Sequence, residues 1–149
     1  DDAGLRLVTK VSFDEHLIMF KNDLKKMGLN KKDLQYYKNL CTSLLQINKG
    51  SIYGVCDKNN TLLATALFAN DDTRMYYLHS ASTSKGKKTG ASHFLVNELM
   101  KLHIGKIVDF EGSNIEGVAR FYKGFGAHHT FYSTVKINRL PFYLRWLKL

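Results

Sequence analysis

The sequence predicts an α/β protein, more fully an α+β fold built on one mixed β-sheet with helices on its faces. Three observations lead to this expectation. Residues 12–50 carry apolar side chains at helical spacing, residues 51–82 form three strand-like runs separated by polar turns, and residues 84–137 alternate helical and strand patterns. The expected architecture is a helical hairpin, an antiparallel meander and a β-α-β-α-β C-terminal half.

The first two helices carry recognisable end signals. Ser12 and Glu15 have the spacing of a capping box, and Gly28 is expected to end the first helix. The second helix is expected to begin near Asn30 and to end at Gly50. The side chains expected to face the core are Phe13, Leu17, Phe20, Leu24 and Met27 in the first helix, and Leu34, Tyr37, Cys41, Leu44 and Leu45 in the second.

The meander follows as three short strands. The runs SIYGVCD, TLLATALFA and MYYLHSAS are joined by polar turns. The middle run is almost entirely apolar, which predicts burial on both faces and therefore helices on both sides of the sheet. A later helix should start after Gly90, end at Gly105 and turn Ala91, Leu95, Leu99 and Leu102 inward. Residues 128–137 are expected to form the last strand.

Lysines cluster in the segment SKGKKTG, between the meander and this later helix. Its glycines let successive backbone N–H groups face one point, the helix start adds a positive dipole end, and the lysines add charge for phosphates. The pattern is typical of a pyrophosphate cradle. A solvated lysine-rich turn explains it equally well.

The segment KIVDFEGSNIEGVARFYKGFGA reads as strand, turn and helix. Ser113 and Glu116 have capping-box spacing, which predicts that the helix starts at Ser113 and that its free N–H groups point back at the strand end. We expect the functional site at this turn.

Composition narrows the class of protein. The chain has 149 residues, 44% hydrophobic and 23% charged, which suits one soluble globular domain. Its 22 Lys and Arg against 13 Asp and Glu give a net charge of +9, favouring an anionic nucleotide, a phosphorylated cofactor or RNA, or serving solubility alone. Cys41 and Cys56 lack metal or redox spacing, so we expect free buried thiols and a reducing cytoplasm. No apolar run is long enough to span a bilayer.

The order of these elements, together with DFEGSNIEGVARFYKGFGA, resembles the GNAT superfamily of acetyl-CoA-dependent acyltransferases. Within it, the segment is most similar to bacterial proteins related to the FemAB aminoacyltransferases. The resemblance covers about residues 50–136. It implies a single GNAT-like domain over residues 1–149, and the start DDAG suggests the C-terminal domain or a fragment of a longer chain.

The resemblance also implies a cofactor and a substrate class. The cofactor would be acetyl-CoA or another acyl-CoA, and the acceptor a small-molecule or peptide amine, with no metal. The residues implied in cofactor binding are Ala81, Ser82, Lys85, Gly86, Lys87, Lys88, Thr89, Gly90, Ala91 and Asn114.

Acyl transfer to an amine needs a base to take the amine proton and an acid to protonate the departing thiolate. Glu111 and Tyr122 are the candidates, and His79 is a second candidate base. Each has a structural interpretation as well. Glu111 could pair with Arg120 or Lys123, Tyr122 could be a packed ring, and His79 could be a hydrogen-bonded core residue.

Two other functions remain open from the sequence. One is aminoacyl transfer from tRNA, which the FemAB resemblance allows and in which Arg120 and Lys123 would contact RNA phosphates. The other is a non-catalytic GNAT-like module that binds a partner through its helical hairpin or its C-terminal tail. A homodimer is compatible with each.

Overall fold

The computed structural model describes residues 4–27, 30–131, 141 and 143. Within these residues, five strands form one sheet in the order β1-β2-β3-β4-β5. The strands are β1 (Arg6–Val8), β2 (Gly50–Cys56), β3 (Leu62–Asn70), β4 (Arg74–Ser82) and β5 (Ile107–Asp109). Strands β1 to β4 pair antiparallel and β5 pairs parallel to β4, which confirms the meander and the mixed sheet.

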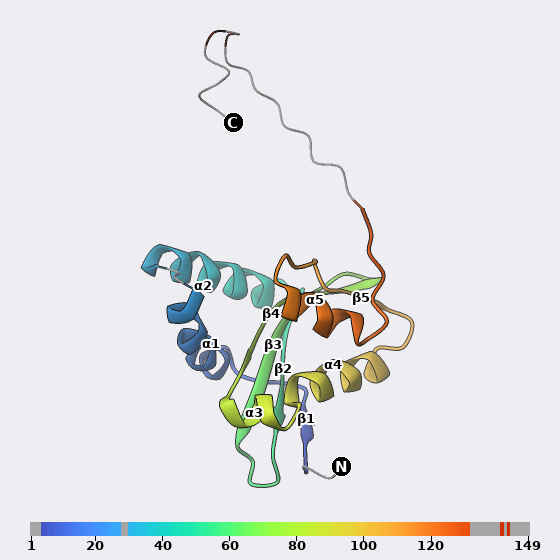
Figure 1. Cartoon of the computed structure of the whole chain (residues 1–149). Helices are drawn as coiled ribbons and strands as arrows, with labels where there is room; N and C mark the ends of the chain where they lie inside the picture. The colour runs from blue at the N-terminus through green and yellow to red at the C-terminus, as the bar shows by residue number, and fades with distance from the viewer. Residues whose placement is uncertain (1–3, 28–29, 132–140, 142, 144–149) are drawn as a thin grey trace.

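Helices cover both faces of this sheet (Figure 1). Helices α1 (Phe13–Met27) and α2 (Lys31–Gln46) pack on one face, where Cys41 meets Ile52 and Leu67. Helix α4 (Ala91–Leu102) packs on the other, where Leu95 and Phe68 share a core with side chains of α5 (Glu116–Lys123). Adjacent residues Leu67 and Phe68 are both fully buried, so the expected burial of β3 on both faces is confirmed.

The N-terminal helix signals are confirmed. The Ser12 hydroxyl accepts from the Glu15 N–H, and the Glu15 carboxylate accepts from the Ser12 N–H. Asn30 caps α2 in the same reciprocal way with Asp33. The described helices are also too short or too polar to cross a bilayer.

The expected end of α2 at Gly50 is wrong, because α2 stops at Gln46 and Gly50 is the first residue of β2. Asn48 takes a left-handed conformation, φ 54°, and turns the chain. A Cβ at Gly50 would lie 2.8 Å from the Leu44 Cβ. This glycine therefore permits a close approach of β2 to α2 and does not cap the helix.

The expected lysine-rich loop is also wrong, because Ser84–Lys88 forms the short helix α3. Thr83 is its N-cap, and its hydroxyl accepts from the Gly86 N–H at 2.9 Å. The helix after Gly90 is confirmed, but it ends at Leu102 and not at Gly105, and Leu102 is 54% exposed and does not face the core.

Helix α5 begins at Glu116 and not at Ser113. Glu111 and Gly112 take left-handed conformations, φ 57° and 76°, which prevents the helix from starting directly after β5. The Ser113 hydroxyl accepts from the Ile115 N–H in a tight turn, and the Glu116 carboxylate pairs with Arg120. The side chains that would form a capping box therefore have other partners.

Two strands differ from expectation. The edge strand β1 was not predicted from the sequence. Of the expected last strand, residues 128–131 are not in a strand, and residues 132–137 lie outside the described residues. Most of the C-terminal tail also lies outside them.

Strand β4 has two features that position the site. It pairs with β5 only from Arg74 to Tyr76, because β5 ends at Asp109, and from Tyr77 to Ser82 it pairs with β3 alone. The register with β3 also shifts, since Leu67 faces His79 while Phe68 faces Tyr77. This β-bulge turns His79 toward α1 and α2, while Tyr77 and Ser80 face α4 and α5.

Candidate functional site

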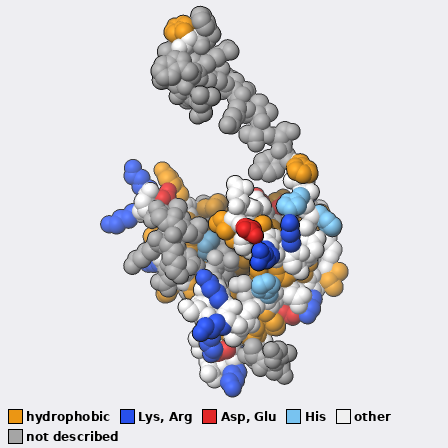
Figure 2. All heavy atoms as spheres, in the orientation of Figure 1, with side chains coloured by type: hydrophobic (Ala, Val, Ile, Leu, Met, Phe, Trp, Pro, Cys, Tyr) orange, Lys and Arg blue, Asp and Glu red, His pale blue; other side chains and the backbone are white. Residues whose placement is uncertain are grey.

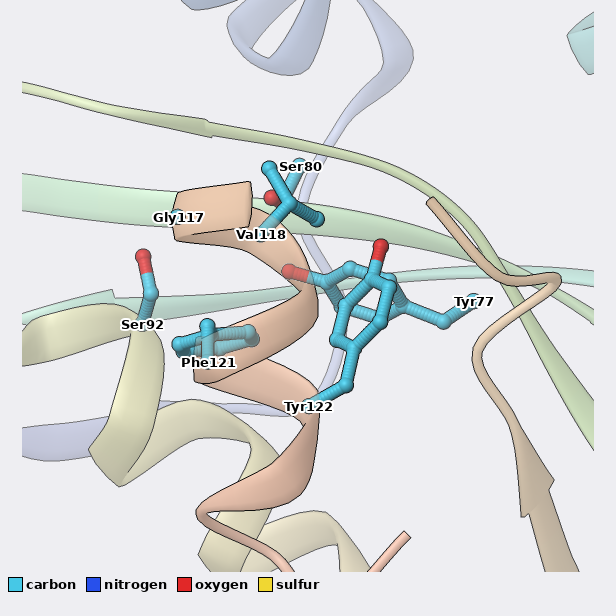
Figure 3. Close-up of a pocket in the computed structure, with 7 residues that line it drawn as sticks. All are labelled: Tyr77, Ser80, Ser92, Gly117, Val118, Phe121 and Tyr122. Atoms are coloured by element: carbon cyan, nitrogen blue, oxygen red, sulfur yellow. The ribbon is translucent and has the colours of Figure 1, made fainter. Parts of the chain in front are cut away.

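A cavity of about 190 Å³ lies beside the part of β4 that follows its pairing with β5. Its walls come from β4, the start of α4 and one side of α5. In Figure 3, the hydroxyl groups of Tyr77, Ser80 and Tyr122 point toward the same part of this cavity. We call it the hydroxyl cavity, and the residues that line it are Tyr77, Ser80, Ser92, Gly117, Val118, Phe121 and Tyr122.

Tyr122 is held in the hydroxyl cavity by other rings. It stacks on Phe110 with ring centroids 4.5 Å apart and meets the edge of Tyr77 at 6.1 Å. Burial raises the pKa of Tyr122, and it raises the pKa of Tyr77 to about 12 against a smaller effect of the hydrogen bond with Ser80. Both phenols therefore keep their protons at neutral pH and can donate hydrogen bonds.

A second cavity of about 160 Å³ adjoins the first, because Ser92 and Phe121 line both. Gly90, φ 69°, is the N-cap of α4 and leaves this helix without a side-chain cap. The N–H groups of the first turn of α4 thus lack intrahelical acceptors and can bind an anion. We call this the helix-start cavity, and its lining residues are Gly86, Lys87, Gly90, Ser92, His93 and Phe121.

The other side of β4 is closed. His79 packs edge-on against Phe20, with ring centroids 4.0 Å apart, and against His16 and Tyr37. His16 is fully buried and hydrogen-bonds to Thr65 and to the Tyr37 hydroxyl. Burial lowers the pKa of His79 to about 3, with a further contribution from His16, and lowers that of His16 to about 4. Both imidazoles are therefore neutral at pH 7.

Comparison with solved structures identifies the fold of this chain, whereas comparison by sequence finds no match. No protein-family model matches the sequence, and no curated protein matches it by sequence. A possible acetyltransferase from Clostridium difficile 630 is 14% identical, with a TM-score of 0.66 over 92% of this chain and 99% of that one. A predicted acetyltransferase with acetyl-CoA from Clostridium acetobutylicum is 21% identical, with a TM-score of 0.53 over 90% and 94%.

The protein has the GNAT fold. This confirms the fold class expected from the sequence. FemX shares the fold at 16% identity, with a TM-score of 0.64 over 84% of this chain. The match covers 50% of the FemX chain, so this chain spans about half the length of FemX.

The lysines of the predicted cradle have different surroundings in this GNAT domain. Figure 2 shows Lys and Arg side chains gathered over α3, where Lys85, Lys87 and Lys88 lie. Lys85 donates to the Asp57 carboxylate at 2.5 Å, which lowers the pKa of Asp57. Lys87 lines the helix-start cavity, and Lys88 is exposed outside both cavities.

Most backbone amides of the predicted cradle are used within α3 and the following turn. The N–H groups of Gly86 and Lys87 bond to Thr83, and that of Thr89 bonds to the Lys85 carbonyl. The Gly90 N–H bonds to the Lys87 carbonyl. A bound anion would therefore meet the first amides of α4 and not those of the preceding segment.

Gly86 lies close to β3, because a Cβ there would come within 2.3 Å of the Leu63 carbonyl oxygen. Because Gly86 has no side chain, α3 can pack closely against β3 beside the helix-start cavity. The remaining residues implied in cofactor binding line neither cavity: Ala81 and Ala91 are buried, Ser82 bonds to the Leu63 carbonyl, Thr89 bonds to carbonyls of α3, and Asn114 is exposed.

Glu111 lies directly after Phe110, the ring that stacks on Tyr122. It is exposed, and its carboxylate makes no ion pair within the described residues, since Arg120 pairs with Glu116. Its φ of 57° is uncommon for a residue with a long side chain and costs about 1–3 kcal/mol in backbone strain. Such outliers cluster at functional sites, so the position of Glu111 merits a functional test.

Several residues of the hydroxyl cavity were not found from the sequence. Gly117 and Phe121, and likewise Val118 and Tyr122, are four residues apart and form two rows on one side of α5. This spacing was a usable signal. Tyr77 and Ser80 could not be assigned to one face of β4, because alternation places them on opposite faces and only the bulge brings them together.

Proposed function

We propose that this GNAT domain transfers an acyl group from acyl-CoA to an amine. The observation that carries the proposal is the pair of adjoining cavities on one side of β4. One offers a helix start and a lysine, and the other offers hydroxyl groups between aromatic rings. The helix-start cavity suits the phosphates of a ligand, and the adjoining hydroxyl cavity suits a linear, partly polar arm of the same ligand.

The residues present fit such a ligand. The helix-start cavity would take phosphate oxygens on the first amides of α4, with Lys87 adding positive charge. In the hydroxyl cavity, Ser80, Ser92 and Tyr122 supply hydrogen-bonding groups, and Val118 supplies an apolar wall. Lys85 would not bind the phosphates directly, because its ammonium group donates to the Asp57 carboxylate.

Bound acyl-CoA would supply an acyl group activated as a thioester. Glu111 would accept the proton that the amine loses as its nitrogen bonds to the acyl carbon. Tyr122 would donate a proton to the sulfur as the C–S bond breaks, which its raised pKa permits because the phenol stays protonated at neutral pH. The products are an amide and the free thiol of CoA.

His79 is the weaker candidate for the base. A general base works best when its pKa lies near the working pH, whereas burial holds the pKa of His79 near 3. Its Nδ1 is buried without a hydrogen-bond partner among the described residues, and its ring packs on the closed side of β4. Because rings enclose His79 while Glu111 is exposed, we propose Glu111 for the amine proton, although it lines neither cavity.

The acceptor we propose is a small-molecule or peptide amine. Cys41 and Cys56 are both free and buried, which is consistent with a reducing compartment such as the cytoplasm.

Calorimetric titration of the intact chain with CoA and acetyl-CoA tests the proposal. We expect saturable binding of both ligands with one site per chain. A folded chain that binds neither ligand at millimolar concentration would eliminate acyl-CoA as the donor.

The match to FemX favours one second candidate, aminoacyl transfer from tRNA. In this case, Arg120 and Lys123 on the exposed side of α5 would contact RNA phosphates. Filter binding to aminoacyl-tRNA over a salt series separates the two functions. A steep loss of affinity with salt, without competition by acetyl-CoA, would support this candidate, and negligible binding at low salt would remove it.

A further inference from the structure

Gly117 differs from the other glycines of the described chain. Each of the others has a structural reason to lack a side chain, either a left-handed conformation or a neighbouring atom too close for a Cβ. The left-handed ones are Gly4, Gly90, Gly105, Gly112 and Gly126, and the crowded ones are Gly50, Gly54, Gly86 and Gly124. Gly117 has ordinary helical conformation, and a Cβ built on it meets nothing within 4 Å.

Gly117 also makes helix α5 less stable than alanine would at this position. α5 has only eight residues, and alanine is favoured over glycine at helical positions because it loses less backbone entropy on folding. No packing contact in the described residues compensates for this, since nothing lies within 4 Å of a Cβ built at this position. Gly117 is exposed and is also a lining residue of the hydroxyl cavity.

The position of Gly117 within the cavity indicates what the space is for. Gly117 and Phe121 form one row along α5, and Phe121 also lines the helix-start cavity. Val118 and Tyr122 form the neighbouring row, which ends at the proposed acid (Figure 3). Gly117 therefore lies one helical turn from Phe121, which borders both cavities, while Tyr122 borders the reacting end.

We infer that Gly117 is a binding residue for the arm of the acyl donor. Its missing side chain keeps the cavity wide enough for an unbranched arm of methylene and amide groups to pass between α5 and β4. This inference rests on the proposed function. It assigns Gly117 to the arm of the donor and not to the acyl group, which would lie beyond it toward Tyr122.

The test uses the intact chain with Gly117→Ala and Gly117→Leu, and Glu116→Gln as a control on the same helix outside both cavities. Alanine adds one methyl group and leucine adds a longer side chain, both compatible with a helix. Overfilling a packed site weakens it by a factor of about 5 to 150. We expect roughly fivefold weaker CoA binding for Gly117→Ala and at least about 30-fold for Gly117→Leu.

Two further readouts distinguish the inference from a structural role. Thermal unfolding should give Gly117→Ala a Tm equal to or above that of the wild type. Acetyl-CoA and a longer acyl-CoA should lose affinity by the same factor as CoA. Glu116→Gln should leave all three affinities unchanged.

Unchanged CoA affinity in both glycine variants would overturn the inference while leaving the proposed function in place. A lower Tm for Gly117→Ala would overturn it by showing a structural role. A loss that grows with acyl length while CoA itself binds normally would assign the space to the acyl group and overturn the arm assignment. A wild-type chain that binds no CoA would overturn the proposed function and this inference together.

Discussion

The two sides of β4 contrast sharply. On the side of α1 and α2, His79 is enclosed by Phe20, His16 and Tyr37, and His16 makes hydrogen bonds at both ring nitrogens. On the side of α4 and α5, Tyr77 is one of several hydroxyl-bearing side chains that border a cavity. One strand thus has a closed, packed side and a side that borders a cavity lined by hydroxyl groups.

This difference separates structural from functional polar groups. The polar side chains of the closed side are enclosed by other side chains, so their loss should change stability. Those of the open side border a cavity that a ligand can enter, so their loss should change binding or turnover. The following predictions test this division.

The largest expected effect is the pH dependence of the closed side. His16 has a pKa lowered to about 4 by burial, whereas in the unfolded chain it is near 6.5. The unfolded state therefore binds more protons between these values, and stability falls as the pH drops from about 6.5 to 4, by roughly 3 kcal/mol from His16. His79, with its pKa of about 3, acts in the same direction.

Chemical denaturation at pH 7, 6, 5 and 4.5 measures this dependence. His16→Gln should lower stability at pH 7 but flatten the slope between pH 6.5 and 4.5. The exposed His128 offers a matched control, since His128→Gln should keep the wild-type profile. Equal slopes in wild type and His16→Gln would contradict the assignment of the closed side.

The next effect concerns turnover. Glu111→Gln keeps the shape of the side chain and removes its basicity, so it should lower kcat by about 100-fold or more while leaving CoA affinity near the wild-type value. His79→Gln should lower kcat much less than Glu111→Gln does, when kcat is calculated for the folded fraction of each variant. If His79→Gln lowers kcat more than Glu111→Gln does, the base lies on the other side of β4.

The smallest expected effect separates two neighbouring lysines. Lys87→Ala should weaken CoA binding about fivefold at low salt, as expected for a partly exposed charge-assisted contact. Lys85→Ala should leave CoA affinity unchanged and lower the Tm, because it removes the partner of the Asp57 carboxylate. Equal losses of CoA affinity in both variants would show that Lys85 also contacts the phosphates.

The sequence predicts most of the framework because the framework depends on local patterns. The near-continuous apolar run of β3 indicates burial on both faces, and Leu67 and Phe68 are buried accordingly. The Ser12 and Glu15 pair predicts the start of α1 through contacts between residues close in sequence.

The site is less predictable because it depends on longer-range geometry. The bulge that places Tyr77 and Ser80 on one face arises from pairing with β3 and has no signature within β4 itself. Lys85 resembles a phosphate ligand by sequence, but Asp57, 28 residues away, holds it. Ser113 has the spacing of a cap, yet the left-handed Glu111 and Gly112 move the helix start to Glu116.

A crystal structure of the chain soaked with CoA tests the central claim most directly, because it shows which side of β4 takes the ligand. We expect the arm of CoA in the hydroxyl cavity, passing Gly117 toward Tyr122, and its phosphates at the first turn of α4 near Lys87. CoA bound between β4 and the helices α1 and α2, or crystals that take up no CoA at millimolar concentration, would contradict the account.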